Sequence, residues 1–338
     1  MIEPGTQPFG TSGSRSSFRW RRPARAAFAA ILLAAAAAAP VLAQDANYLL
    51  PVPDIEARLR DGGMAIIDWR GSRMPNDRTQ RMTVQFPDSV VLVVKLAKAP
   101  YGGTTFNNEP RYELAAYEIQ ELFLDPTDYV VPPTVVRSLP IEFLKPYDTN
   151  VSPTFDKTNS VVAVLQYWLL AVTPENFYDR DRAKADTTYA RYLGNFNILT
   201  YLIRHNDANQ GNFLISQSPT MPRIFSVDNG VAFESQVSDR GYEWRNMRVD
   251  RLSAKTVERL RAITPERLRE RLGVLVQFGI RDGLLVAEPA GANLDEGRGV
   301  RRSDTTVQFG LTSREIRGVE DRLRRLLEDV DKGKLKVF

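Results

Sequence analysis

The sequence predicts an α+β protein, and three observations support this fold class. Apolar runs enriched in β-branched residues, typical of strands, occupy much of the chain between residues 64 and 97. Two stretches with helical apolar spacing, residues 108–124 and 187–204, are separated by further strand-like runs. From Asp250 onward the pattern is helical and rich in charge. Strands, helix, strands and helices in this order indicate an α+β fold, and roughly 295 residues can form one two-lobed domain or two small ones.

The first 43 residues have the pattern of a targeting segment. Arginines precede an alanine- and leucine-rich run from residue 26 to 39, and the Pro-Val-Leu-Ala of residues 40–43 then offers small residues for cleavage. The run is too short and too rich in alanine for a comfortable membrane span, so a cleaved signal is favoured over an anchor. We therefore expect residues 1–43 to be a signal peptide and the rest to be exported, periplasmic or secreted, with membrane contact only through the signal segment.

Composition excludes several classes of function. The net charge of +4 comes from the targeting segment, because removing its five arginines and one glutamate leaves 40 basic and 40 acidic residues. Because residues 44–338 have no net charge, they provide no electrostatic attraction for nucleic acid, and no nucleic-acid partner is expected. The chain has no cysteine, which excludes disulfides, thiol chemistry and cysteine zinc sites. The single histidine, His205, cannot build a multi-histidine metal site.

The first strands contain a lysine in an unusual setting. After a short helix that ends near Gly62, strands are predicted at residues 64–69, 81–86 and 89–97. Lys95 stands in the last of them, which is otherwise almost wholly apolar, and a buried lysine is costly unless it is paired. Lys95 therefore either lies at an exposed edge of the strand or is a cation placed over nucleotide phosphates. Gly71 and Ser72 lie between two of these strands.

Residues 108–124 predict a helix that begins with Asn108 as its N-cap. Its apolar stripe has Glu113 and Glu118 on opposite sides. Helical spacing alone leaves open which of the two carboxylates reaches Lys95.

Two further strands are predicted at residues 130–136 and 160–170, with a polar loop before the second. The second strand ends near Gln166 and Tyr167, where the chain can pass from one lobe to another. We therefore expect an N-terminal lobe at residues 44–168 and a C-terminal lobe at residues 169–338.

The most informative segment combines two short motifs. Residues 205–212 have the order H-x-D-x-x-x-x-N, with Asp207 and Asn212 at its last two named positions, and Asp228 opens a D-x-G sequence. Apolar runs on either side of a turn-forming loop predict a hairpin between the motifs. If Asn212 lies opposite Asp228, their Cα atoms are about 5 Å apart and two oxygen ligands converge on one cation, which suits Mg²⁺. The alternative is a polar turn before a surface hairpin, in which these residues serve only as turn formers.

The C-terminal third is predicted to be helical. Helix starts of the Ser/Thr-plus-acid kind occur at residues 264–266 and 312–315. Residues 288–304, rich in Gly, Ala, Pro and charge, predict a loop between helices. The arginines within residues 322–325 are typical of the solvated face of an amphipathic helix.

The chain resembles the protein-kinase-like superfamily over about residues 64–233. The resemblance rests on an ordered set of five residues: Lys95, Glu113, Asp207, Asn212 and Asp228. Two atypical branches are the most similar. Secretory-pathway kinases of the Golgi casein kinase type resemble it at Glu-Leu-Ala-Ala-Tyr (113–117) and Val-Pro-Pro-Thr-Val-Val-Arg (131–137). Type II phosphatidylinositol 4-kinases share with those enzymes the Asp-Asn-Gly of residues 228–230.

This resemblance implies a bilobal protein-kinase-like fold with a small β-rich N-terminal lobe and a mostly helical C-terminal lobe. It implies that Glu113 is the partner of Lys95, that Asp207 is the catalytic base, and that Asn212 and Asp228 hold Mg²⁺ or Mn²⁺. The implied nucleotide-binding residues are Lys95, Gly71, Ser72, Gln166 and Tyr167.

The implied activity is transfer of the γ-phosphate of ATP to a hydroxyl of a protein Ser/Thr side chain or of a sugar. One alternative is a secreted pseudokinase, a binding module without catalysis. Another is a nucleotidyl transferase that uses the same pocket to add AMP to a hydroxyl.

Overall fold

The computed structural model describes residues 45–71, 79–105, 109–233, 235 and 238–338. The chain divides into two units, Met1–Gln44 and Asp45–Phe338, and the description concerns the second. The expected signal peptide, Ser72 and the expected N-cap Asn108 lie outside the described residues. Among the helices of the described segments, none combines the length and apolar character needed to cross a membrane.

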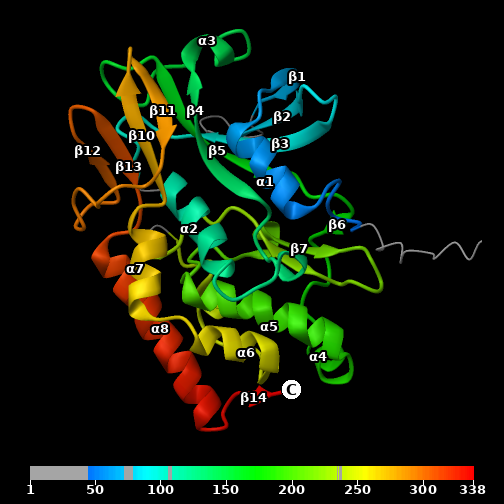
Figure 1. Cartoon of the computed structure of the whole chain (residues 1–338). Coiled ribbons are helices and arrows are strands. Elements are labelled where there is room, and N and C mark those ends of the chain that lie inside the picture. The colour runs from blue at the N-terminus through cyan, green and yellow to red at the C-terminus, as the bar shows by residue number, and fades with distance from the viewer. Residues whose placement is uncertain (1–44, 72–78, 106–108, 234, 236–237) are drawn as a thin grey trace, which may run out of the picture. The chain divides into compact units, whose positions relative to one another are not determined.

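A five-stranded antiparallel sheet in the order β1-β2-β3-β5-β4 forms the N-terminal lobe (Figure 1). Its strands are β1 (Ala65–Arg70), β2 (Thr79–Gln85), β3 (Val91–Lys98), β4 (Thr134–Pro140) and β5 (Ser160–Tyr167). The central strands are rich in valine and leucine because both of their faces are covered, and every residue of β5 is buried. The predicted strands are thus present, with ends that differ by a few residues.

Three helices belong to this lobe: α1 (Val52–Asp61), α2 (Pro110–Gln120) and the single turn α3 (Ile141–Leu144). Both α1 and α2 contact β4 and β5. All eleven residues of α2 are buried, so its polar side chains must find partners inside the protein. This helix connects the sheet to the rest of the molecule.

The C-terminal lobe is mostly helical (Figure 1). Its helices are α4 (Arg180–Ala185), α5 (Thr187–Leu202), α6 (Ala254–Arg261), α7 (Pro265–Gly273) and α8 (Ser313–Asp331), with short 3₁₀ turns η2 (Gln210–Asn212) and η3 (Tyr242–Arg245); a further 3₁₀ turn, η1 (Pro126–Asp128), lies between α2 and β4. It also holds the sheet β6 (Val172–Thr173), β7 (Phe213–Ser216) and β8 (Ile224–Ser226), and the pair β9 (Arg251–Leu252) and β14 (Lys336–Val337). One hydrophobic cluster extends through both lobes and includes Val94, Tyr117, Phe196, Phe225 and Leu326.

The C-terminal third differs from the sequence prediction. Residues 276–309 form a four-stranded sheet in the order β11-β10-β13-β12, where helix and loop were expected. The strands are β10 (Val276–Arg281), β11 (Leu284–Glu288), β12 (Val300–Arg302) and β13 (Thr306–Phe309). A two-residue turn joins β10 to β11, with positive φ at Asp282 (49°) and Gly283 (74°). Asp-Gly between two apolar runs is a strong hairpin signal in this part of the sequence.

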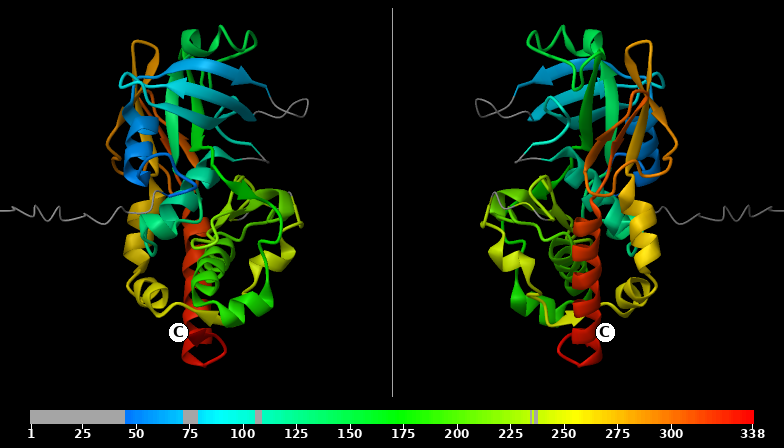
Figure 2. Two further views of the ribbon diagram at one scale, coloured as in Figure 1. Left: turned by 90° about the vertical axis from the view of Figure 1, so that its right-hand side faces the viewer. Right: turned by 90° about the vertical axis from the view of Figure 1, so that its left-hand side faces the viewer.

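This second sheet packs against the N-terminal lobe, as the two views of Figure 2 show. Phe278, Leu285, Val307 and Phe309 share a buried cluster with residues of β4 and β5 and with Leu114 of α2. This packing explains why residues 276–309 form strands, because a short strand becomes stable when its apolar face is covered by another part of the protein.

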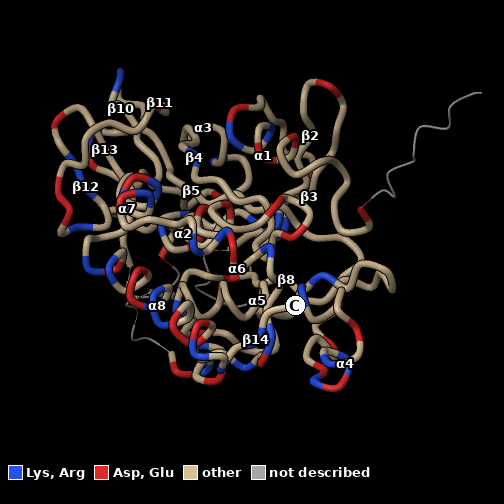
Figure 3. Tube along the Cα trace, turned by 60° about the horizontal axis from the view of Figure 1, so that its bottom comes forward, with Lys and Arg blue, Asp and Glu red and all other residues tan. Residues whose placement is uncertain are grey.

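Charged side chains of both signs are interspersed along the chain (Figure 3). On α8 the apolar Leu323 and Leu326 are buried, whereas Arg324 is exposed and pairs with Asp321 and Glu328. The helix begins with the expected capping box, in which Thr312 and Glu315 exchange hydrogen bonds. The prediction of a solvated arginine face on an amphipathic helix is confirmed for Arg324.

The β7–β8 hairpin has a different register from the expected one. Phe213 pairs with Ser226 and Ile215 with Ile224, so Asn212 lies opposite Val227 and not opposite Asp228. The loop explains this one-residue difference. Arg223 is fully buried, donates to Asp45 at 2.5 Å, and places its carbonyl 2.8 Å from the amide of Ser216. A buried, paired arginine holds the register where the apolar pattern allows more than one.

Candidate active site

Three elements bring one lysine and two carboxylates together between the lobes. Lys95 lies on β3 and is 8% exposed. Its Nζ is 2.8 Å from Oε1 of Glu113 on α2 and 3.0 Å from Oδ1 of Asp228, which follows β8. Of the two glutamates that spacing left open, Glu113 is the one in contact with Lys95. Glu118 pairs instead with Arg271 of α7, at 2.5 Å.

The charges in this cluster stabilise one another. Burial by itself would lower the pKa of Lys95, but the carboxylates of Asp228 and Glu113 outweigh it and raise that pKa. Lys95 in turn lowers the pKa of Asp228. Burial raises the pKa of Glu113, against the opposing effect of Lys95. A lysine held charged in a nearly water-free position is suited to binding an anion.

Asp228 reaches Lys95 because the backbone turns sharply after β8. Its φ is +61°, a conformation that Asp tolerates better than most residues. The next residue, Asn229, donates its backbone N–H to Oε2 of Glu113 at 3.0 Å, and its side-chain oxygen accepts from Ser226 Oγ at 2.7 Å. The Asp-Asn-Gly turn is therefore fixed through its central residue, and 43% of the Asp228 side chain remains exposed.

The loop after α5 carries Asp207 and Asn212 close together. The amide nitrogen of Asn212 donates to the carbonyl of Asp207 at 2.8 Å and to its Oδ2 at 3.2 Å. Arg204 ends the helix with a φ of +49°, and Asn206 donates its backbone N–H to Val231 at 3.0 Å. The amide nitrogen of Asn212 is thus used within the loop, so a cation at this residue would bind its amide oxygen.

Two polar side chains that sequence reasoning missed contact Asp207. Arg240 donates from Nε to Oδ1 at 2.6 Å and from Nη2 to Oδ2 at 2.8 Å, and Ser238 Oγ donates to Oδ1 at 2.8 Å. The segment that carries them packs closely on the loop, because a Cβ on Gly241 would lie 2.0 Å from the carbonyl of His205. Nothing in the local sequence marks Arg240, since the contact joins residues 33 positions apart.

His205 is a buried, neutral residue of the loop. Burial lowers its pKa to about 4, although the nearby Asp228 and Asp207 act in the opposite direction. Its ring lies edge-on to Phe213, with centroids 6.2 Å apart. These contacts support a role in shaping the loop.

The remaining candidate nucleotide-binding residues have a mixed placement. Gln166 donates to Thr134 at 2.9 Å, and the hydroxyl of Tyr167 accepts from the backbone of Leu49 at 3.0 Å; both side chains are buried. Gly71 is exposed at the end of β1, and the adjoining Ser72 is not described. Trp168, which follows β5, is 38% exposed and was not among the sequence candidates. Nucleotide contacts at 166 and 167 would therefore involve the backbone.

The donor set can accept a divalent cation that also binds phosphate. Within the described residues, no three acidic, histidine or cysteine side chains form a ready metal cluster. Mg²⁺ commonly binds one or two carboxylates and takes its other oxygens from phosphate and water. The half-exposed Asp228 and the amide oxygen of Asn212 fit that incomplete type of site.

A separate cavity of about 870 Å³ lies on another face of α2. Glu118, Arg271 and Phe278 are among its lining residues, whereas Lys95, Asp207 and Asp228 are not. Burial raises the pKa of Glu118 to about 7. The cavity is distinct from the cluster around Lys95.

No known family model matches this sequence, and no curated protein is similar to it at the level of sequence. Comparison of structures does find a similar fold. The solved structure of Fam20 from hydra, determined with a sugar, superposes with a TM-score of 0.51 at 13% identity, over 85% of this chain and 92% of that one. At such low identity the similarity establishes the fold alone. The chain therefore has the predicted bilobal α+β, kinase-like fold.

Proposed function

We propose that this chain is an exported phosphotransferase that moves the γ-phosphate of ATP, bound with Mg²⁺ or Mn²⁺, to a hydroxyl of a protein Ser/Thr side chain or a sugar. The observation that carries the proposal is the buried Lys95, held between Glu113 and Asp228 at 2.8 and 3.0 Å. A scaffold has no need to bury this charge cluster, because buried ion pairs contribute little net stability.

The residues have distinct tasks in this proposal. Lys95 binds phosphate oxygens, and Glu113 orients Lys95. Asp228 and Asn212 would hold the divalent ion, which would supply charge neutralisation at the phosphates. Asp207 orients the acceptor hydroxyl and takes its proton as the new O–P bond forms. The bond between the γ-phosphorus and the bridging oxygen breaks, and ADP leaves.

The contacts of Asp207 set a condition on this reaction. Its carboxylate accepts four hydrogen bonds, from Arg240 to both oxygens, from Ser238 to Oδ1 and from Asn212 to Oδ2, so all of its acceptor sites are used. The acceptor hydroxyl must therefore displace at least one of these hydrogen bonds. The Arg240 contact is the less costly one to displace, because 69% of its side chain is exposed and exposed ion pairs contribute little stability.

Export and acceptor class have separate support. Arginines precede the apolar run of residues 26–39, and this pattern supports export. We also place the boundary between the two lobes near residue 168. A sugar is present in the structure of the hydra protein with the similar fold, which supports a sugar acceptor as well as a protein hydroxyl.

The Arg240–Asp207 contact also suits the alternative of a pseudokinase, in which Asp207 does not act as a catalytic base.

The decisive test is transfer of label from γ-labelled ATP to protein and sugar acceptors with Mg²⁺ or Mn²⁺. We expect transfer by the purified protein and its loss in Asp228→Ala and Asp207→Asn. Mass spectrometry of the acceptor should show added phosphate, whereas added AMP would indicate nucleotidyl transfer. Transfer that survives Asp228→Ala would refute this mechanism, and nucleotide binding without transfer would support the pseudokinase.

A further inference from the structure

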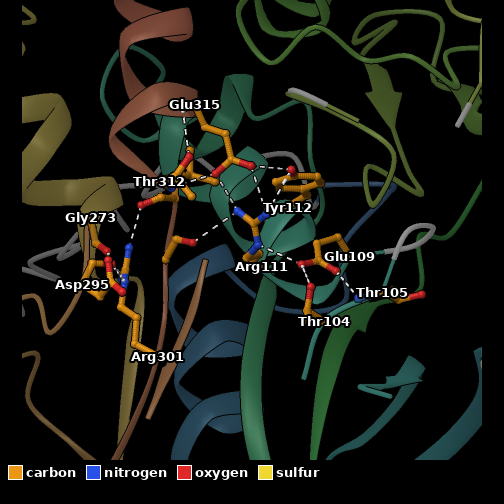
Figure 4. A network of polar contacts seen from close by, with 12 residues as sticks. Thr104, Thr105, Glu109, Arg111, Tyr112, Gly273, Asp295, Arg301, Thr312 and Glu315 are labelled. Atoms are coloured by element: carbon orange, nitrogen blue, oxygen red, sulfur yellow. Dashed lines mark hydrogen bonds and ion pairs between the residues drawn. The ribbon is translucent and has the colours of Figure 1, made fainter. Parts of the chain in front are cut away.

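The helix that carries Glu113 is fixed on its other side by the C-terminal helix α8 (Figure 4). Arg111, two residues before Glu113, is 8% exposed. Its Nη1 donates to Oε2 of Glu315 at 2.6 Å and its Nη2 donates to Oε1 at 3.0 Å. The two residues are 204 positions apart, and both hydrogen bonds are charge-assisted.

Glu315 is itself held in one geometry. Its Oε2 accepts from the backbone N–H of Thr312 at 2.7 Å, and its own N–H donates to Thr312 Oγ1 at 3.2 Å, which is the capping box of α8. Its Oε1 also accepts from the hydroxyl of Tyr112. The carboxylate that binds Arg111 is thus fixed to the start of a 19-residue helix.

The first turn of α2 is joined to the Asp-Asn-Gly turn on the opposite side. The backbone N–H of Glu109 donates to the carbonyl of Gly230 at 2.9 Å. The N–H of Asn229 donates to Glu113 at 3.0 Å, and the rings of Tyr112 and Phe233 lie 5.0 Å apart. The side chain of Glu109 also accepts from Arg111 at 2.9 Å. A shift of this turn of α2 would therefore move Glu113 and disturb Asp228.

We infer that Arg111 and Glu315 are a positioning pair, through which α8 holds Glu113 and Lys95 in the arrangement that binds nucleotide phosphates. The inference about geometry rests on the contacts above, and its consequence for nucleotide rests on the proposed function. Neither residue touches the reacting groups. They act through Glu113, which lies two residues after Arg111 in α2 and contacts Lys95.

The test compares a double variant with a matched control. Arg111→Met with Glu315→Gln removes the ion pair between α2 and α8 while keeping the volume and an acceptor for Thr312. Glu109, which also accepts from Arg111, keeps its hydrogen bonds from Thr104 and Thr105. Thr312→Ala is the control. It weakens the cap of α8, typically by about 1 kcal/mol, but leaves the Arg111–Glu315 contact in place.

The first readout is pulse labelling of Lys95 by acetic anhydride, followed by mass spectrometry, on the full chain without nucleotide. Pairing with Glu113 and Asp228 protects Lys95, so we expect labelling to accelerate at least tenfold in the double variant and less than twofold in Thr312→Ala. Equal labelling of the double variant and the wild type would overturn the inference. Equal acceleration in both variants would also overturn it, since loss of stability alone would then explain the effect.

The second readout is calorimetric titration with MgATP, which separates this inference from the proposed function. We expect the double variant to bind at least tenfold more weakly than the wild type, with Thr312→Ala within twofold. If the wild type does not bind MgATP while the labelling result holds, the proposed function fails and the positioning of Glu113 by α8 stands. If the double variant binds as tightly as the wild type, the pair has no positioning role.

Discussion

Replacing Lys95 by methionine tests the charge cluster most directly. Methionine keeps the unbranched shape in β3 but leaves the carboxylates of Glu113 and Asp228 without their cation. At 2.8 and 3.0 Å, and with an effective dielectric constant of about 20, each ion pair has a Coulomb energy of about 6 kcal/mol before desolvation is subtracted. Removing one partner of a buried pair typically costs about 3–5 kcal/mol, and we expect that loss of unfolding free energy.

Two comparisons make the expectation specific. Adding Glu113→Gln to Lys95→Met should recover part of the loss, because Glu113 is 3% exposed whereas the Asp228 side chain is 43% exposed and stays solvated. The loss should also be smaller at low pH. Without Lys95 the pKa of Glu113 is raised further by burial, so the folded state gains stability from protonation as the pH falls.

Urea unfolding of the wild type, both single variants and the double variant at pH 5 and pH 8 measures these effects. A loss below about 1 kcal/mol in Lys95→Met would refute the account, because such a value is typical of exposed ion pairs. A double variant as unstable as the sum of the single variants would show that Lys95 and Glu113 do not interact.

Three further predictions concern other parts of the molecule. Glu118 has a pKa raised to about 7, so its contribution to the unfolding free energy should decrease as pH rises from about 4.5 to about 7. In urea unfolding, Glu118→Gln should make this decrease smaller by up to about 3 kcal/mol. Arg240→Ala should raise turnover by at most about fivefold, because it frees Asp207 from an exposed ion pair, whereas a tenfold decrease in steady-state assays would assign Arg240 a role in the reaction. Gly103→Ala should lower the unfolding free energy by about 1–3 kcal/mol, since φ is +80° and the new Cβ would lie 3.0 Å from Phe309; an unchanged melting temperature would contradict the packing described here.

Local patterns were sufficient for much of the N-terminal lobe. A lysine in an apolar strand and a helix with a glutamate on either side of its apolar stripe could be located from residue type and period, because periodicity acts over a few residues. The burial of all eleven residues of that helix was seen only in the structure. The order of Asp207, Asn212 and Asp228 likewise indicated a polar site after a helix. The Asp-Gly turn of residues 282–283 is a hairpin signal of the same local kind.

The sequence alone identified Lys95, Glu113, Asp207, Asn212 and Asp228 as candidates for the site. The tertiary structure decided how they are arranged and which other residues contact them. The contact of Arg240 with Asp207 and the link from Arg111 to Glu315 join segments far apart in the chain. The contact of Lys95 with Glu113 followed from the family resemblance, whereas helical spacing left Glu113 and Glu118 open. The hairpin register depended on the buried Arg223, and the second sheet on cover from the first lobe. Such contacts depend on which surfaces meet after folding, and a pattern of period 2 or 3.6 contains no information about its partner.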